Sequence, residues 1–285
     1  AIAFCNSVTD FSRINDFNME EIEKIEVLKG PAAATLYGTE ASNGVISIIT
    51  KKGQKGKAKI SFVAKSGTNN LPKDPKEYFM PVFYTSTGVD GNTPGDIIEV
   101  NVIAEDAKNG MDWFQEGSIS AYNLDISGGG DNHTYYVSAG WNDENGIVDY
   151  NWKRGLNGRA NVTLLPTPTL KLSFGLGTVQ SRTEFSSAQQ PLSTAIIWAC
   201  PAPGCEPKSG LPNALDGPYR GYIAYLPEAY QNEIEGFQDL DRTTWNASAT
   251  HDPTTWLNHR ITIGGDYGNT RSTELYKATG NIGNF

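Results

Sequence analysis

Apolar and polar residues alternate in several segments of the chain after residue 56, and this alternation predicts β-strands. The pattern is cleanest in 152–164 and in 170–178, where the apolar positions are Leu156, Ala160, Val162 and Leu164, then Leu170, Leu172, Phe174 and Leu176. Successive side chains of a strand face opposite sides, so each of these strands has one apolar face and one polar or small face.

The same pattern predicts seven strands in all, at 59–65, 120–127, 134–142, 152–164, 170–178, 243–250 and 257–267. The strands of a soluble β-sandwich and those of a membrane β-barrel both alternate in this way, so alternation alone does not distinguish these two architectures. The connections differ in length. Those at 128–132, 166–169 and 251–256 are short, that at 143–151 is modest, and those at 67–119 and 181–242 are very long. Short turns at one end and long loops at the other are typical of outer-membrane barrels.

Aromatic residues are placed near both expected ends of these strands, which favours interfacial girdles over core filling. Those near the long-loop end are Tyr122, Trp141, Trp152 and Trp245, and those near the short turns are Tyr135 and Trp256. No run of about 20 apolar residues is present for a membrane helix, so a membrane protein of this composition must be a β-barrel.

The segment 22–53 has a different pattern, IEKIEVLKGPAAATLYGTEASNGVISIITKKG. Two apolar runs, 22–28 and 45–49, predict two strands. Pro31 suits the first turn of a short helix over 32–34, Gly38 is placed to end that helix in a left-handed conformation, and Asn43-Gly44 predicts a turn. Before it, Asn18 is placed to cap a short turn through Glu20 and Glu21.

The sequence of this segment resembles the distal half of the plug domain in TonB-dependent outer-membrane transporters, most closely the SusC/RagA branch. The motifs that show the resemblance are Val27-Leu28-Lys29-Gly30-Pro31-Ala32-Ala33, Leu36-Tyr37-Gly38 and Asn43-Gly44-Val45-Ile46. Three further motifs look like the first barrel hairpins of this family: Asn123-Leu124-Asp125-Ile126-Ser127-Gly128-Gly129, Tyr135-Tyr136-Val137-Ser138 and Glu144-Asn145-Gly146-Ile147. The likeness covers about residues 11–180.

The resemblance implies a mainly β fold: the C-terminal half of an α+β plug domain, then about seven antiparallel strands of an incomplete transmembrane β-barrel. We expect a distal plug over 1–53 and a barrel portion over 54–285. Seven strands cannot close around a plug, since plugged outer-membrane barrels use about 22. The expectation is therefore a fragment that would not insert or transport alone, with the plug's front half, the TonB box and further strands outside it.

The resemblance also implies a function: active import of oligosaccharides or peptides across the bacterial outer membrane. The implied partners are the TonB–ExbB–ExbD energising complex, a SusD-like lipoprotein, the substrate and outer-membrane lipid. The expected plug and gating residues are Lys29, Gly30, Pro31, Tyr37, Gly38, Asn43 and Gly44. Aromatic residues of the second long loop are candidates for stacking on substrate, or simply for packing that loop: Trp198, Tyr219, Tyr222 and Tyr225.

No catalytic set, cofactor motif or metal-ligand spacing is found, so we expect no enzyme activity and no cofactor. The net charge of −9 argues against a nucleic-acid partner. Cys200 and Cys205 are spaced for a small disulfide loop, with two free thiols as the alternative. The run 90–96 hints at a calcium loop, but a turn fits better because Asn101 stands at the closing position. Two rival readings remain open: a passive outer-membrane barrel, and a soluble secreted glycan-binding module.

Overall fold

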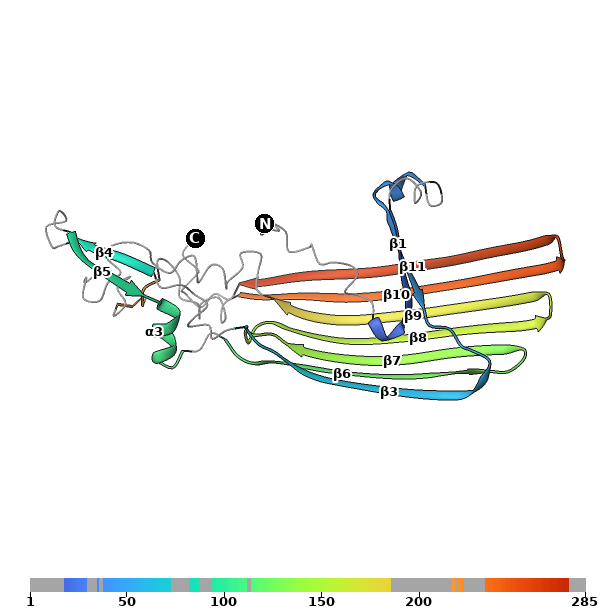
Figure 1. The fold of residues 1–285 in the computed structure, drawn as a ribbon, viewed down its shortest axis with the longest axis horizontal. Helices are drawn as coiled ribbons and strands as arrows, with labels where there is room; N and C mark the ends of the chain where they lie inside the picture. Colours follow the sequence, from blue (N-terminus) through green and yellow to red (C-terminus); the bar gives the residue numbers. More distant parts are fainter. Residues whose placement is uncertain are drawn as a thin grey trace.

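The computed structural model describes residues 18–29, 35, 38–72, 82–87, 94–111, 114–185, 217–218, 220–222 and 234–276. Its main feature is a seven-stranded antiparallel sheet with the strand order β11-β10-β9-β8-β7-β6-β3 (Figure 1). The strands are β3 (Gly56–Asn69), β6 (Gly117–Gly129), β7 (His133–Asn145), β8 (Trp152–Thr167), β9 (Leu170–Phe185), β10 (Ile234–Thr254) and β11 (Leu257–Tyr276).

All seven strands expected from the alternation are present, and each is longer than the sequence pattern indicated. Their order is consecutive, and the sheet does not close, because β3 and β11 each have a single neighbour in it. The mainly β, antiparallel fold class is therefore confirmed. The tight hairpin turns β6–β7, β8–β9 and β10–β11 lie together at one end, and the long connections leave from the other end (Figure 1).

Two short elements follow β3 within the first long connection. These are the hairpin of β4 (Val82–Thr87) and β5 (Pro94–Val100), and the helix α3 (Val102–Lys108). Asn101, which stood at the closing position of the hinted calcium loop, is instead the N-cap of α3, since its Oδ1 accepts from the Ala104 amide at 3.0 Å. Neither α3 nor the β4–β5 hairpin was expected from the alternation. No helix in the described part of the chain is both long and apolar enough to cross a membrane.

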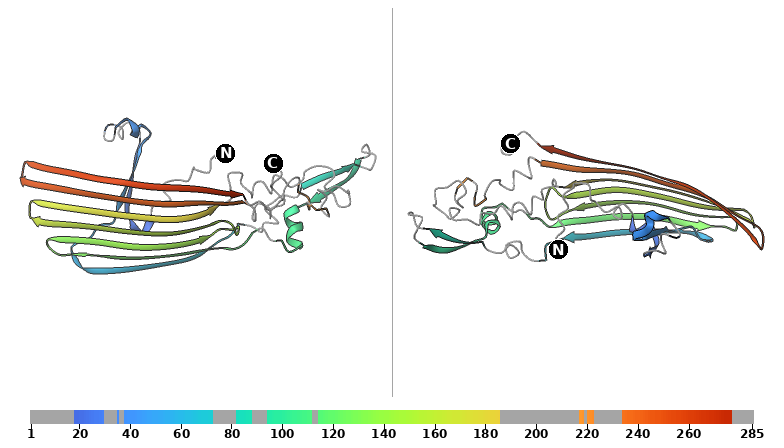
Figure 2. Two further views of the ribbon diagram at one scale, coloured as in Figure 1. Left: turned by 180° about the vertical axis from the view of Figure 1, so that it is seen from behind. Right: turned by 90° about the horizontal axis from the view of Figure 1, so that it is seen from above.

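The N-terminal part forms a separate two-stranded hairpin. After the 3-10 turn η2 (Met19–Glu21), β1 (Ile22–Leu28) pairs with β2 (Val45–Thr50), and η3 (Thr39–Asn43) precedes β2. Asn18 caps η2 as expected, accepting from the Glu20 amide at 3.0 Å. We call residues 18–51 the plug hairpin. It crosses the seven strands at a steep angle and does not extend their sheet (Figures 1 and 2).

Gly38 and Gly44 lie at either end of η3, and both have positive φ. Gly44 has φ 109°, and a Cβ there would lie 2.8 Å from the Leu28 carbonyl oxygen, so only glycine fits this close return of the chain. The turn expected at Asn43-Gly44 is present. The expected left-handed ending at Gly38 is wrong: φ 87° with ψ −177° is far from left-handed helix, and Gly38 begins η3. The helix expected over 32–34 lies outside the described residues.

The large sheet has two chemically different faces. We call the face that contacts the plug hairpin the inner face, and the opposite one the outer face. In-register pairing carries the apolar positions of one strand onto those of the next, as in Phe62↔Leu124 and Val162↔Phe174. The outer face consequently exposes large apolar side chains on all seven strands: Ile60, Phe62, Tyr122, Leu124, Val137, Trp141, Leu156, Leu164, Phe174, Leu176, Trp245, Ile261, Ile263 and Tyr267.

An apolar surface of this extent is far larger than the patches that soluble monomers expose. Aromatic rings line up across neighbouring strands on it. Tyr122 stacks on Trp141 with ring centroids 5.7 Å apart, and Phe62 stacks on Tyr122 at 6.3 Å. The inner face is polar and rich in Asn, Ser, Thr and Gly. The outer face therefore needs an apolar environment, while the inner face suits water and the plug hairpin.

Candidate functional site

The plug hairpin is held on the inner face by Glu21, the last residue of η2. Its side chain is only 4% exposed. One carboxylate oxygen accepts from Ser138 Oγ at 3.0 Å and from Asn157 Nδ2 at 2.7 Å. The other accepts from Arg159 Nε at 2.8 Å. Three donors from β7 and β8 thus converge on one carboxylate of the hairpin.

The Glu21–Arg159 pair is a buried ion pair, since the Arg159 side chain is 12% exposed. A buried pair of this kind adds little net stability compared with apolar residues, because both charges lose their water. Removing one partner is different, because it leaves a charge buried without compensation, at a cost of about 3–5 kcal/mol. The pair therefore acts as a latch: it fixes the position of the hairpin, and its loss is costly.

The C-terminal end of the plug hairpin binds the same part of the sheet as Glu21 does. The Lys51 amide donates to the Glu21 carbonyl at 2.9 Å, so the end of β2 is joined to the end of η2. Asn161 is two positions along β8 from Arg159, on the same face of the sheet. Its Nδ2 donates to the Lys51 carbonyl at 2.6 Å and lies 3.4 Å from Thr50 Oγ1. Both ends of the hairpin thus bind β8.

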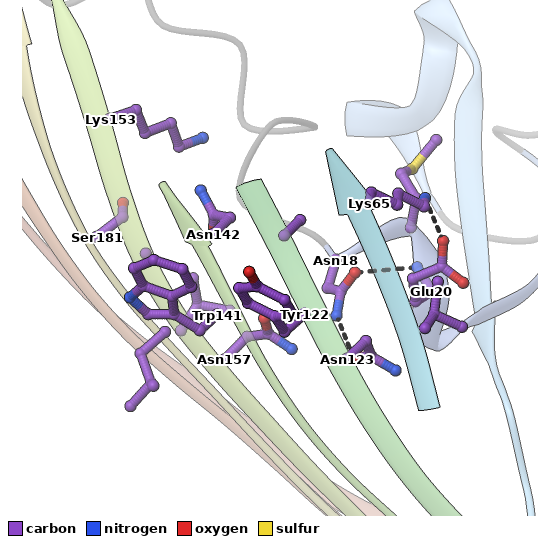
Figure 3. A pocket seen from close by; sticks show the side chains of 16 residues that line it. Asn18, Glu20, Lys65, Tyr122, Asn123, Trp141, Asn142, Lys153, Asn157 and Ser181 are labelled. Carbon is purple, nitrogen blue, oxygen red and sulfur yellow. Dashed lines mark hydrogen bonds and ion pairs between the residues drawn. The ribbon is translucent and has the colours of Figure 1, made fainter. Parts of the chain in front are cut away.

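A second set of contacts joins the start of the hairpin to β3 and β6. Asn18 Nδ2 donates to Asn123 Oδ1 at 3.0 Å, and Lys65 pairs with Glu20 (Figure 3). The Lys65 side chain is 57% exposed, so this second ion pair is weak compared with the buried one. The contacts of β3 and β6 position the hairpin, while those of β7 and β8 hold it.

A cavity of about 280 Å³ lies where η2 meets the sheet (Figure 3). Polar side chains that surround it include Asn18, Lys65, Asn142, Lys153 and Asn157. Amide and ammonium donors of this kind suit a polar ligand rich in oxygen. The Nδ2 of Asn123, also in its lining, is buried without a hydrogen-bond partner among the described residues.

The linker after β2 passes close under the sheet at Gly53. A Cβ at this position would lie 2.3 Å from the Tyr135 amide nitrogen and 2.4 Å from its carbonyl oxygen. No side chain fits at that distance from a backbone. Further along, Lys55 pairs with Asp131 in the β6–β7 turn, and its hydrogen bond and positive charge lower the pKa of that carboxyl group.

Four of the plug and gating residues expected from sequence are among the described residues, and they lie at the end of the hairpin away from the latch. Lys29 follows β1 and is exposed, Asn43 is the last residue of η3, and Gly38 and Gly44 flank η3. Gly30, Pro31 and Tyr37 lie outside the described residues. Sequence reasoning missed Glu21 and Arg159 as site residues. Two features of the sequence could have indicated them. Glu21 is a carboxylate at the end of the turn that Asn18 caps, and Arg159 is the arginine on the polar face of the most regularly alternating strand.

Of the four aromatic residues expected to stack on substrate, only Tyr222 is among the described residues. Its side chain is fully buried, and its hydroxyl donates to Asp106 Oδ2 at 2.9 Å. Arg220 binds the same carboxylate, with Nε 3.0 Å from Oδ1 and Nη2 3.4 Å from Oδ2. Asp106 lies on α3, so this cluster joins the two long connections. In this structure Tyr222 has the packing role.

We expect Asp106→Ala to separate α3 from residues 220–222, because it removes the buried carboxylate that both Arg220 and Tyr222 bind. The buried carboxylate, 2% exposed, makes this a loss of about 3–5 kcal/mol of local stability. Amide hydrogen exchange of α3 measures it, and the exchange should become at least tenfold faster. Glu105→Ala is the matched control, since Glu105 pairs with the exposed Lys108 and its loss should change exchange little. Unchanged exchange in Asp106→Ala would contradict the cluster's role.

Comparisons with known proteins agree with this geometry. The family model described as the TonB-dependent receptor plug domain matches residues 5–45. The chain is 34% identical over 136 residues to the TonB-dependent receptor SusC of Bacteroides thetaiotaomicron, a match that covers 46% of this chain and 13% of the relative. It is 25% identical over 233 residues to the TonB-dependent receptor P26 of Formosa agariphila, covering 79% of this chain and 22% of that protein.

The fold is also similar to solved structures. A structure of the RagAB peptide importer in the closed-closed state matches with a TM-score of 0.65 and 20% identity, covering 93% of this chain and 35% of that chain. The hairpin docked inside a curved antiparallel sheet, together with these matches, is similar to part of a TonB-dependent receptor. Within that class the similarity is to the SusC/RagA type, in sequence to SusC and in fold to RagAB. The chain spans less than a quarter of the length of either SusC or P26.

Proposed function

We propose that the chain contributes the gate of an outer-membrane active importer. The observation that carries this proposal is the position of the plug hairpin. It lies across the polar inner face of a sheet whose outer face is apolar, and it is held there by Glu21 and Arg159. A sheet with this polarity suits a wall between lipid outside and an aqueous lumen inside. A hairpin lying across that lumen blocks passage until it moves.

The proposal includes a division of the chain into a distal plug over 1–53 and a barrel portion over 54–285. It is supported by the end of β2 at Thr50, the start of β3 at Gly56 and the close passage at Gly53. The proposed gating residues are Lys29, Gly30, Pro31, Tyr37, Gly38, Asn43 and Gly44. It supports this proposal that the four described ones lie at the end of β1 and at η3, away from the latch: Lys29, Gly38, Asn43 and Gly44.

The proposed location is the bacterial outer membrane, and the proposed substrates are oligosaccharides or peptides. Supporting them are the similarity to SusC and to the RagAB peptide importer. The proposed partners are the TonB–ExbB–ExbD complex, which would pull on the plug from the periplasmic side, and a SusD-like lipoprotein. Trp198, Tyr219, Tyr222 and Tyr225 are the proposed substrate contacts, and Tyr222 would have to leave Asp106 to take this role.

Uptake of a labelled ligand by cells that express the complete receptor tests the proposal. A malto-oligosaccharide and a peptide of similar mass serve as the two probes. We expect one probe to accumulate, and accumulation to stop when tonB is deleted or the proton gradient is collapsed. Uptake that survives both treatments would indicate a passive barrel. Failure to take up either probe, with the receptor present in the outer membrane, would overturn the proposed substrate classes.

A further inference from the structure

The outer face has a row of five charged residues that the importer function does not use. Register places Asp143 opposite Arg154, Arg154 opposite Arg182, Arg182 opposite Asp239, and Asp239 opposite Arg271. The row crosses β7 to β11 without a break. It is on the outer face because Asp143 and Arg154 are each an odd number of positions from Ser138 and Arg159, which point inward to Glu21.

This charged row runs along a groove of about 530 Å³. Two apolar residues, Trp141 and Leu156, form the floor of the groove, and its rim includes Arg154, Arg182 and Arg271. Trp141 and Leu156 lie two positions along β7 and β8 from the charged row, which is roughly 7 Å at the rise of a strand. The groove therefore joins an apolar floor to a cationic rim over a distance similar to that between acyl chains and a lipid headgroup.

The two central arginines lie directly opposite each other, and like charges in that position repel. Each is held from the far side by one carboxylate. Arg154 Nε is 3.3 Å from Asp143, and Arg182 Nε is 3.6 Å from Asp239. Each guanidinium also covers an aromatic ring, Arg154 over Trp152 at 4.5 Å and Arg182 over Phe237 at 4.4 Å. A guanidinium over an aromatic ring keeps an N–H edge with which it can bind a phosphate through two hydrogen bonds.

The groove is lined by three arginines and by two carboxylates, Asp239 and Asp241. Asp143 pairs with Arg154 and Glu184 interacts with Arg182, so a bound anion would have to compete with these carboxylates for the two arginines. Both central side chains remain half exposed despite their ion pairs, at 57% for Arg154 and 53% for Arg182. An oxyanion between them would replace repulsion by two charge-assisted hydrogen bonds.

We propose that this groove binds the phosphate-bearing headgroup of a lipid in the outer leaflet. The phosphate lies between Arg154 and Arg182, and an acyl chain lies against Trp141 and Leu156. This inference rests on the proposed outer-membrane location. A bound lipid at this point would brace β8 and β9 at the end of the sheet from which the long connections leave.

Lipid exchange on the complete receptor in detergent tests the inference. Phosphatidic acid and phosphatidylcholine with the same acyl chains are the probes, and native mass spectrometry counts the bound lipid. We expect phosphatidic acid to bind at least tenfold more tightly than phosphatidylcholine. Arg154→Gln with Arg182→Gln should remove that preference, because hydrogen bonds to charged groups are among the strongest in proteins. Arg260→Gln is the control, since this exposed arginine lies near the β10–β11 turn.

Asp239→Asn separates lipid binding from a merely structural role. It removes the carboxylate that competes with a lipid phosphate for Arg182, so we expect Asp239→Asn to increase phosphatidic acid binding. If the charged row only stabilises the sheet, both Asp239→Asn and the double arginine variant should bind less phosphatidic acid. Heat-modifiable migration on gels reports insertion of each sample. Intact insertion without the lipid preference, or inorganic phosphate binding as tightly as the lipid, overturns the lipid site alone. Failure of the unmodified receptor to insert overturns the proposed function and the site together.

Discussion

Replacing Arg159 by alanine in the complete receptor should open the lumen to ions without any energy input. The Glu21 carboxylate would keep Ser138 and Asn157 but lose the only cation that contacts it in the described part of the chain. A buried charge left without its partner costs about 3–5 kcal/mol. At 1.4 kcal/mol per tenfold change, the population with a displaced hairpin should rise by about a hundredfold or more. Conductance of single receptors in planar bilayers measures that population directly.

Two further variants show whether the latch itself is responsible. Lys65→Ala removes the exposed pair with Glu20 and should leave the conductance nearly unchanged, since exposed pairs contribute about 1 kcal/mol or less. The double variant Glu21→Gln with Arg159→Met removes both charges. It should open the receptor less than Arg159→Ala alone, because no unpaired charge remains buried. Equal opening by Lys65→Ala and Arg159→Ala would contradict the latch.

Gly53→Ala should prevent the hairpin from seating at all. The added Cβ would lie 2.3 Å from the Tyr135 amide nitrogen, and the obstacle is backbone, which cannot turn away as a flexible side chain can. The linker must then shift by an ångström or more, and the contacts of Lys51 and Asn161 just before it would break. We expect the yield of folded receptor in the outer membrane to fall roughly tenfold, in line with the large effects of overpacking.

Gly67→Ala is the matched control for that change. A Cβ at Gly67 would meet only the Ile119 Cβ at 4.0 Å, which is an ordinary contact between neighbouring strands. Its yield should equal that of the unmodified receptor, as measured by heat-modifiable migration of the membrane fraction. If Gly53→Ala accumulates as well as Gly67→Ala, then the passage of the linker beneath Tyr135 is not as the structure has it.

The sheet could be predicted from sequence because its two faces differ so strongly. Leu156, Val162 and Phe174 could only point to one side, and a shift by one residue would have turned all of them inward. The plug hairpin was predictable for another reason, since Asn18, Asn43 and Gly44 have specific local roles in a cap and a turn. Strand ends were underestimated because beyond the apolar zone the outer face becomes polar, as at Arg182 and Arg271.

The latch could not be predicted from the pattern. Glu21 and Arg159 are 138 residues apart, and their meeting depends on how the hairpin lies across β7 and β8. The same holds for Asp106, Arg220 and Tyr222, which belong to two different long connections. Gly38 shows a smaller limit: the sequence indicated a positive φ, but ψ depends on η3, whose 3-10 turn leaves no periodic pattern.

The central claim is that the plug hairpin must leave the inner face for import to occur. The most direct measurement is a reducible cross-link between Asn18→Cys and Asn123→Cys, made with a short bis-methanethiosulfonate reagent, since the Asn18 Nδ2 and Asn123 Oδ1 atoms lie 3.0 Å apart in the docked state. It is made in a receptor with Cys5, Cys200 and Cys205 replaced by serine. We predict that cross-linking stops uptake of the labelled ligand, and that a reductant restores it in the same cells. Full uptake while the cross-link is intact would contradict the claim.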